Sequence, residues 1–164
     1  MKRADKLYKM IRHYVKDEDI ILDWKCGMSP LAKYFHNTNK FIGFDIDKNI
    51  IDKLKYKYPK CGWINDSYEN ITFENIDILL VLGIVHDTKT ANYILECIKI
   101  HRPKIVMLDT STNYRVEGEE IIERKVGGIT EEFLNLFLLI KNQNYSLIEK
   151  EVYENRFYCV LKGE

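Results

Sequence analysis

The stretch Ile20-Ile21-Leu22-Asp23-Trp24-Lys25-Cys26-Gly27-Met28-Ser29-Pro30 decides the fold of this 164-residue chain. Residues 20–22 are apolar and typical of a buried strand, Asp23 follows them, and the small residues around Gly27 indicate a tight turn. Pro30 is well placed as a first helical residue, because its missing N–H is not needed there. The stretch therefore predicts a strand, a turn and a helix in direct succession.

A second strand is predicted at Phe41-Ile42-Gly43-Phe44, with Asp45 at its C-terminal end. In open parallel sheets, ligands bind outside the carboxyl ends of the strands. A carboxylate there, about 20 residues past a glycine turn, is placed to accept both hydroxyls of a ribose. Asp45 could instead cap the next helix, but Asp47 fits that cap better by position. The two strands together predict a site for an adenosine-containing small molecule.

The turn itself narrows the choice of ligand. A nicotinamide-dinucleotide site needs three glycines so that the backbone can approach a pyrophosphate. This turn has only Gly27, with Lys25 and Ser29 where further glycines would stand. Asp23, just before the turn, would repel a pyrophosphate but suits a ligand with ammonium or sulfonium charge.

In these residues the chain resembles the class I S-adenosylmethionine-dependent methyltransferases. The first motif of that family runs apolar-apolar-acid-x-Gly-Cys-Gly-x-Gly. Asp23, Cys26 and Gly27 match it, whereas Lys25 and Ser29 depart from its first and third glycines.

Later motifs extend the resemblance from about Asp17 to the C-terminus. The second motif, a strand ending in Gly-x-Asp, is matched by Gly43 and Asp45. Residues 63–67, Trp-Ile-Asn-Asp-Ser, match the third less specifically, and residues 77–83, Asp-Ile-Leu-Leu-Val-Leu-Gly, match the fourth. The order and spacing of the motifs carry the resemblance more than any one of them.

The resemblance implies an α/β fold, a doubly wound and mostly parallel seven-stranded sheet of order 3-2-1-4-5-7-6. The last strand is antiparallel, and helices cover both faces. It implies one Rossmann-like domain over residues 1–164, with an N-terminal helix at about 2–16 before the first strand. It also implies an enzyme that uses S-adenosylmethionine as cofactor. The residues expected to contact that cofactor are Asp23, Lys25, Cys26, Gly27, Asp45, Ile46, Asp66, Ser67, Leu82 and Gly83. Asp66 could equally be a turn residue.

Apolar periodicity predicts alternating helices and strands. The expected helices are 6–15, 48–58, 91–100 and 133–140, the last apolar enough to be buried. The expected strands are 20–23, 41–45, 62–65, 78–82 and 105–108, followed by a hairpin of 146–151 and 157–161. The polar stretch 114–130 is the one substantial insertion.

Two residues after the fourth strand are candidates for chemistry. Methyl transfer needs the acceptor lone pair in line with the breaking bond, and an acceptor of high pKa also needs a base. His86 could be that base, and Asp87 could orient its imidazole. Alternatively, His86 caps the next helix or packs on the cofactor. Ser111–Arg115, after the fifth strand, is expected to form a polar rim facing the acceptor.

Composition limits the partners. Lys+Arg and Asp+Glu each total 25, and this balance argues against a large nonspecific nucleic-acid surface.

The four scattered cysteines contain no Cys-x-x-Cys pair, so we expect no metal site, and Cys26 is expected to pack rather than react. No apolar run approaches the ~20 residues of a membrane span, and the charged N-terminus is unlike a signal peptide. We therefore expect a cytoplasmic protein with no membrane partner, and a homodimer is left open.

The acceptor is narrowed only by exclusion. The fourth strand ends in Leu82-Gly83-Ile84-Val85-His86 rather than Asn/Asp-Pro-Pro-aromatic, which argues against transfer to nucleobase amines. A small-molecule or peptide-like acceptor is favoured. An RNA methyltransferase is the alternative, because the lysines at 48, 53, 55, 57 and 60 could form a basic stripe. A third hypothesis is a non-catalytic module that binds the cofactor or another adenosine ligand, because Lys25 and Ser29 replace glycines.

Overall fold

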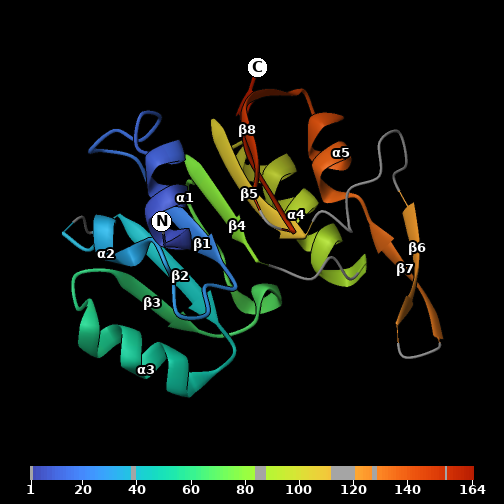
Figure 1. Cartoon of the computed structure of the whole chain (residues 1–164). Helices are drawn as coiled ribbons and strands as arrows, with labels where there is room; N and C mark the ends of the chain where they lie inside the picture. Colours follow the sequence, from blue (N-terminus) through green and yellow to red (C-terminus); the bar gives the residue numbers. More distant parts are fainter. Residues whose placement is uncertain (1, 38–39, 84–87, 112–120, 127–128, 154) are drawn as a thin grey trace.

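The computed structural model describes residues 2–37, 40–83, 88–111, 121–126, 129–153 and 155–164, with the backbone alone for residues 121–134. The helices are α1 (Arg3–Ile11), α2 (Ala32–Phe35), α3 (Lys48–Lys57), α4 (Thr88–His101) and α5 (Leu136–Lys141), with a 3-10 helix η1 (Tyr68–Asn70). The strands are β1 (Ile21–Trp24), β2 (Phe41–Asp45), β3 (Gly62–Asn65), β4 (Ile78–Leu82), β5 (Ile105–Ser111), β6 (Ile121–Val126), β7 (Ile129–Leu134), β8 (Tyr145–Tyr153) and β9 (Arg156–Gly163). Figure 1 shows their arrangement.

Seven strands form one sheet in the order β3-β2-β1-β4-β5-β9-β8. β1 to β5 are parallel, while β9 runs antiparallel to both β5 and β8. Because β6 and β7 lie outside this sheet, β8 and β9 are its sixth and seventh strands. The sequence-based prediction of a 3-2-1-4-5-7-6 sheet with an antiparallel last strand is therefore confirmed. The chain order reverses between β1 and β4, and ligands of doubly wound folds bind in the crevice at such a switch point.

Alternate residues of the central strands divide the core into two layers. Ile78 and Leu80 of β4 face the helices α1, α2 and α3, whereas Leu79 and Val81 face α4 and α5. Because both faces of these strands are covered, β4 is apolar at every position and β5 over residues 105–108, which is why they were easy to predict.

Several predicted boundaries are wrong. Pro30 is not helical, and α2 begins only at Ala32, because the left-handed backbone of Ser29 (φ 45°) delays the helix. The first helix spans Arg3–Ile11 rather than 6–15, and a tight turn in which the Tyr14 N–H donates to the Ile11 carbonyl follows it.

The region after β5 differs most from the prediction. The predicted helix at 133–140 is in fact the end of β7 followed by α5, whose first turn is capped by the Asn135 side chain. The polar stretch 114–130 contains β6 and the start of β7, which pair antiparallel in a sheet of their own. Glu123 pairs with Glu132 and Arg124 with Glu131, so the hairpin lacks the apolar alternation by which strands are recognised.

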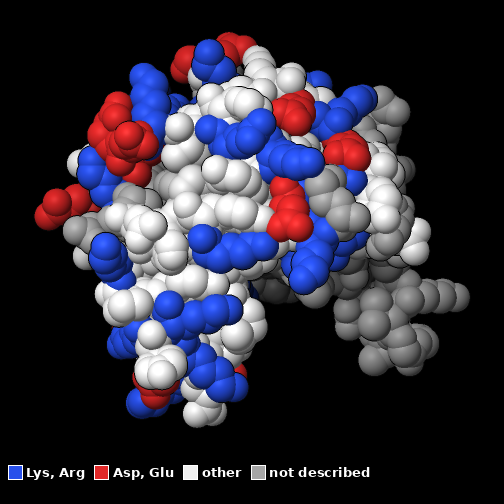
Figure 2. Space-filling model, turned by 60° about the vertical axis from the view of Figure 1, so that its left-hand side comes forward, with Lys and Arg blue, Asp and Glu red and all other residues white. Residues whose placement is uncertain are grey.

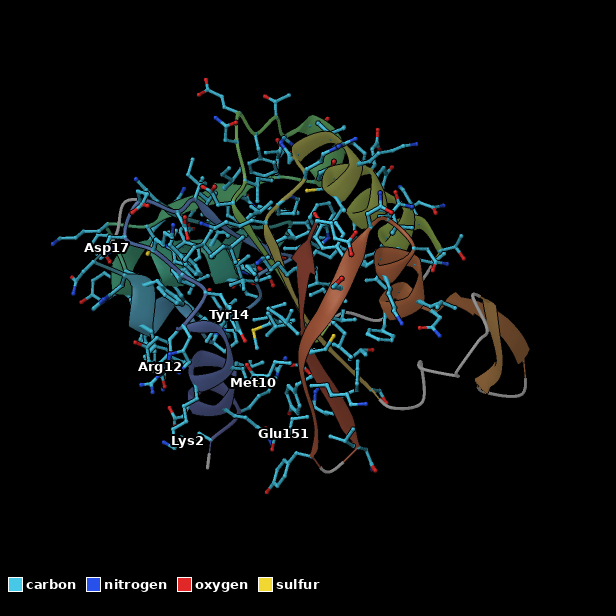
Figure 3. All side chains as sticks on the ribbon, turned by 90° about the horizontal axis from the view of Figure 1, so that it is seen from above. Lys2, Met10, Arg12, Tyr14, Asp17 and Glu151 are labelled. Carbon is cyan, nitrogen blue, oxygen red and sulfur yellow. The ribbon has the colours of Figure 1, made fainter. Side chains whose placement is uncertain are left out.

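Contacts of Lys6 anchor the helix α1 to the C-terminal hairpin of β8 and β9. The buried Lys6 Nζ lies 2.6 Å from Glu151 Oε1 of β8 and 4.0 Å from the ring centroid of Tyr153. Figure 3 shows Glu151 beside this helix. This anchoring fixes the first turn of α1, and with it Arg3, above the sheet.

Within the described part of the chain, no helix has the length and apolar character needed to cross a membrane.

Candidate functional site

The turn after β1 has a glycine-type backbone, meaning left-handed φ angles at three positions, although only one of these residues is glycine. Lys25, Gly27 and Ser29 all have left-handed backbone angles, with φ of 46°, 48° and 45°. A side chain in this region costs roughly 1–2 kcal/mol, which glycine avoids. A Cβ added to Gly27 would meet no atom within 4 Å, so the space beside this residue is open. At Lys25 and Ser29 the backbone thus has the left-handed conformation that glycine adopts most easily.

Asp23, at the end of β1, is buried under this turn. It is 1% exposed, and Ser29 Oγ donates a hydrogen bond of 2.6 Å to its Oδ2. Burial raises the pKa of Asp23 to about 7, against the opposing effects of the Ser29 hydrogen bond and the charge of Arg3, and Asp45 adds to the rise. The residue that replaces the third glycine thus becomes the partner of the buried acid.

Asp45 links the turn to the end of β2. The backbone N–H groups of Gly27 and Asp47 each donate to it over 3.0 Å, one to Oδ2 and the other to Oδ1. An ionised carboxylate offers about four acceptor positions, so about two are left for other donors. Asp47, as expected, caps α3 with its own side chain. Ile46, beside Asp45, is 71% exposed, which is high for a large apolar residue.

A cavity of about 210 Å³ opens next to these residues, at the carboxyl ends of β1 to β3 and the start of α4. Three of its rings contact one another in series at tilted angles: the centroids of Trp24 and Tyr68 are 4.4 Å apart, and those of Tyr68 and Tyr93 are 5.2 Å apart. Its lining residues are Trp24, Lys25, Phe44, Ile46, Ser67, Tyr68, Glu69, Lys89, Thr90 and Tyr93.

Larger hollows of about 500 and 370 Å³ lie near Ile21 and Lys104, at the amino ends of β1 and β5. Others of about 480 and 260 Å³ lie near Tyr145, at the start of β8, and along α4. None of them contains a residue of the predicted site. Because ligands of this sheet type bind at the carboxyl ends, the smaller cavity is the candidate.

The indole of Trp24 lines this cavity and carries a buried hydrogen-bond donor. The side chain is buried, and in the described residues its Nε1–H has no hydrogen-bond acceptor. A buried donor without a partner costs about 1–3 kcal/mol. A ligand with an acceptor atom, such as a ring nitrogen of adenine, would satisfy it.

Lys25 leaves the turn and reaches the first turn of α4, where its Nζ donates to Thr90 Oγ1 over 2.9 Å. Its side chain thus forms part of the cavity wall rather than filling the space above Gly27. Cys26 is buried beside it, and its backbone N–H donates to the carbonyl of Phe44 over 2.9 Å. Burial raises the pKa of the Cys26 thiol, which favours the packing role expected from the sequence.

Asp66 and Ser67 follow β3. Asp66 accepts hydrogen bonds from the Ser67 backbone N–H (2.7 Å) and from Asn70 Nδ2 (2.9 Å), and these bonds lower its pKa. It is therefore a turn residue that holds η1, while Ser67 lines the cavity. An additional contact of Asp66 with a ligand stays a prediction.

The end of β4 lies on the other side of the crevice. Leu82 is half-buried, and Gly83 has a left-handed φ of 73°. A Cβ on Gly83 would lie 2.8 Å from Arg3 Nη2, so Arg3 packs where any other residue would place a side chain. His86 and Asp87 lie outside the described residues, as do residues 112–115 of the predicted rim.

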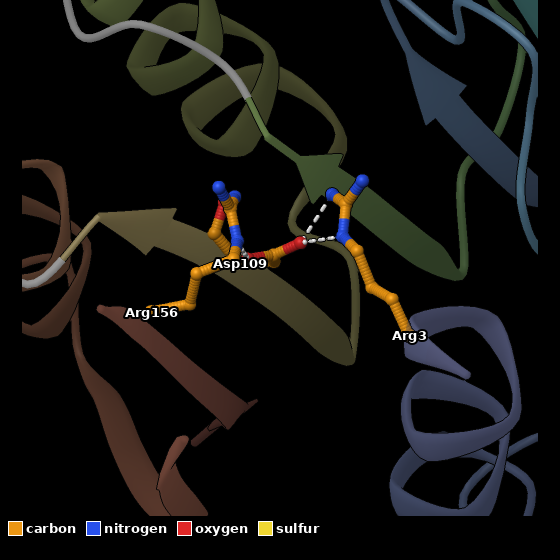
Figure 4. Close-up of polar contacts among 3 residues, drawn as sticks. All are labelled: Arg3, Asp109 and Arg156. Atoms are coloured by element: carbon orange, nitrogen blue, oxygen red, sulfur yellow. Dashed lines mark hydrogen bonds and ion pairs between the residues drawn. The ribbon is translucent and has the colours of Figure 1, made fainter. Parts of the chain in front are cut away.

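Sequence reasoning missed a cluster of three charged residues on this side, shown in Figure 4. Asp109 of β5 is fully buried and lies between Arg3 of α1 and Arg156 of β9. Arg3 Nε donates to Asp109 Oδ2 over 2.7 Å and its Nη2 donates to the same oxygen, while Arg156 Nε donates to Oδ1 over 2.5 Å. The one available signal was an acid directly after the apolar run 105–108.

Comparisons with known proteins agree on the fold. No family model matches the chain, and no curated protein matches it by sequence. Many solved structures do match it. The fold is that of the class I S-adenosylmethionine-dependent methyltransferases.

Three of these structures show the range of sequence identity, coverage and structural similarity among the matches. The magnesium protoporphyrin IX methyltransferase of Synechocystis, with bound S-adenosylhomocysteine, is 9% identical with a TM-score of 0.71, over 98% of this chain and 82% of that one. A TehB-like methyltransferase of Corynebacterium glutamicum is 14% identical with a TM-score of 0.65, over 96% and 87%. The 16S rRNA methyltransferase RmtF is 13% identical with a TM-score of 0.63, and the match spans 98% of this chain but 62% of that one. Methyltransferase folds of such low identity thus serve acceptors of very different size.

Proposed function

We propose that the protein is an S-adenosylmethionine-dependent methyltransferase that acts on a small-molecule or peptide-like acceptor. The observation that carries the proposal is the bond between Gly27 and Asp45, which joins a glycine-type turn to a carboxylate beside an aromatic cavity at the switch point. The three structural neighbours named above carry the same activity in their descriptions, and two of them were solved with S-adenosylhomocysteine.

The residues present fit this cofactor. The aromatic cavity and the unsatisfied Trp24 N–H suit adenine, and the remaining acceptor positions of Asp45 suit the ribose hydroxyls. The open space beside Gly27 leaves room for the methionyl part, and Asp23 beneath the turn suits a positive charge above it. The cofactor, when bound, supplies a methyl group on an electrophilic sulfonium.

The contribution of the chain is then orientation and proton removal. Holding the acceptor in line with the breaking bond can supply much of the rate. We retain His86 as the proposed general base and Asp87 as its orienting partner, because they follow β4 at the ligand end of the sheet. Both proposals rest on sequence position.

Calorimetry with S-adenosylmethionine, S-adenosylhomocysteine, ATP and NAD tests the proposal. We expect the first two to bind with micromolar affinity, roughly −8 kcal/mol, and the others to bind far more weakly. Binding of NAD or ATP without binding of S-adenosylmethionine would overturn it. A cytoplasmic location is part of the same proposal.

An RNA acceptor is the alternative, favoured by one observation. The helices α1, α2 and α3, which cover one face of the sheet, carry several basic residues. Figure 2 shows Lys and Arg side chains spread over the face that it displays, with Asp and Glu side chains among them. Lys48 is paired with Asp52, and Lys33 with Asp5, so part of this charge is compensated. Salt-sensitive binding of RNA oligonucleotides, with affinity falling steeply between low and physiological salt, would favour the RNA enzyme.

A non-catalytic binding module is distinguished by product analysis. The preserved backbone of the turn weakens the case for it, because Lys25 and Ser29 do not close the space beside Gly27. Incubation with a metabolite extract and labelled S-adenosylmethionine should give a methylated product, detected by mass, if the protein is an enzyme. Tight cofactor binding with no product from metabolite, peptide or RNA pools would indicate a module.

A further inference from the structure

The cluster of Arg3, Asp109 and Arg156 holds more positive than negative charge. Asp109 is fully buried, whereas the side chains of Arg3 and Arg156 are 41% and 32% exposed. The carboxylate therefore lies behind two guanidinium groups that face solvent. One carboxylate compensates only one of them, so the exposed side of the cluster presents a net positive charge.

Both arginines keep donors free for a ligand. A guanidinium has five N–H donors, and the bonds of each arginine to Asp109 use Nε and Nη2. In the described part of the chain, no bond is seen from the Nη1 group of either residue. The fork geometry of such groups matches carboxylate and phosphate oxygens.

The neighbouring charges do not cancel this excess. Lys6 is close to the cluster, but it is paired with Glu151. Among the described residues, Asp23 is the other nearby acid, and it is buried with Ser29 as its hydrogen-bond partner. Within the part of the chain that the structure describes, the exposed face of the cluster therefore presents the two arginines alone.

The position of the cluster points to the acceptor. Asp109 pairs with Leu82 in the β4–β5 register, its carbonyl accepts from the Gly83 N–H over 2.8 Å, and Arg3 packs on Gly83. The cluster thus borders the crevice on the β4–β5 side, whereas Asp45 and the aromatic cavity lie on the β1–β3 side. A ligand that filled the cavity would leave the arginines to a second molecule.

We propose that Arg3 and Arg156 bind an anionic group, a carboxylate or phosphate, of the methyl acceptor. The inference rests on the proposed function, because it assigns the other side of the crevice to the cofactor. Asp109 acts as a positioning residue that holds both guanidinium groups at the mouth of the site. The substrate class is therefore an anionic metabolite or an acidic peptide.

The test uses inorganic phosphate and acetate as probes on protein saturated with S-adenosylhomocysteine. The Nε–H signals of Arg3 and Arg156 are followed by ¹⁵N NMR and assigned through Arg3→Lys and Arg156→Lys, which keep the charge. We expect saturable shifts at millimolar phosphate and a loss of affinity of about tenfold or more in each variant, because lysine lacks the fork. Arg12→Gln, which removes one exposed charge outside the cluster at the residue that follows α1, is the matched control and should leave phosphate binding unchanged.

A second comparison identifies the source of the anion. 5′-Methylthioadenosine lacks the amino-acid carboxylate of S-adenosylhomocysteine. Equal phosphate binding with either nucleoside supports the acceptor assignment. Phosphate binding that survives with methylthioadenosine but is abolished by S-adenosylhomocysteine assigns the arginines to the cofactor carboxylate and overturns the inference, as does the absence of any saturable shift. If neither nucleoside binds, the proposed function fails instead, and phosphate titration of the free protein still shows whether the arginines bind an anion.

Discussion

The backbone N–H of Gly27 and the carboxylate of Asp45 are joined by a 3.0 Å hydrogen bond, although the residues belong to different β–α connections. The bond fixes the turn after β1 against the end of β2, so the two parts of the proposed cofactor site are held as one unit. A second hydrogen bond, from the Asp47 N–H, holds the other carboxylate oxygen of Asp45 in position. Such a carboxylate is positioned before any ligand arrives, which lowers the entropy lost on binding.

Asp45→Ala should weaken binding of S-adenosylhomocysteine by about 1.5–3 kcal/mol, because the ribose hydroxyls lose a charged acceptor. Calorimetry on variants with native circular dichroism measures the loss. Asp47→Ala is the control: it removes the cap of α3, costs about 1 kcal/mol of stability, and should leave the affinity nearly unchanged. Wild-type affinity in a folded Asp45→Ala protein would show that Asp45 only holds the turns together.

The buried Asp23 should make stability depend on pH. Its pKa is raised from 3.8 to about 7 in the folded protein, so between these values the folded state binds more protons than the unfolded state. The free energy of unfolding should therefore fall as pH rises through this window, by about 4 kcal/mol at most. Asp23→Asn should flatten the urea-derived profile between pH 4 and 7. An unchanged slope in the variant would place the responsible group elsewhere.

The left-handed backbone at Lys25 predicts a difference between two substitutions. Lys25→Gly and Lys25→Ala both remove the bond to Thr90, but only glycine relieves the strained φ of 46°. The glycine variant should be more stable than the alanine variant by about 1 kcal/mol, despite the greater entropy of its unfolded chain. Urea unfolding of the pair measures the difference, and equal midpoints would mean that the turn relaxes.

The unsatisfied indole N–H of Trp24 predicts that replacing this residue affects the affinity for the ligand and the stability of the free protein differently. Trp24→Phe removes the buried N–H while keeping an aromatic ring, so relief of the unsatisfied donor should offset part of the stability lost with the smaller buried side chain. Affinity for S-adenosylhomocysteine should drop by about 1 kcal/mol if the indole donates to adenine. Unaltered affinity alongside reduced stability would make Trp24 a core residue only. Phe44→Leu, at the same cavity wall, controls for lost packing.

The sequence was most informative where strands are buried on both faces. The apolar runs at 78–82 and 105–108 predicted β4 and most of β5. The glycine turn with Asp45 led to the proposed cofactor side, which stays a prediction. The arginine cluster was not predictable, because Arg3 and Arg156 lie 106 and 47 positions from Asp109 and meet it only after the sheet is assembled. The pairing of Ser29 with Asp23 was missed for a different reason. Comparison with the family motif shows only that Ser29 stands where a glycine is expected. The structure shows in addition that the Ser29 hydroxyl donates a hydrogen bond to Asp23.

The proposed chemistry at His86 gives the last prediction. If His86 removes the acceptor proton, His86→Ala should lower turnover by about 10²–10⁴-fold while cofactor affinity barely changes. The pH–rate profile should lose its acidic limb, because that limb reports protonation of the base. Asp87→Asn, which keeps the shape but not the charge, should give a smaller loss in the same direction. Full turnover in His86→Ala would mean that the reaction proceeds by orientation alone, and loss of cofactor binding would place His86 in the cofactor wall. Both readouts need the acceptor, which the anion-binding test on Arg3 and Arg156 helps to identify.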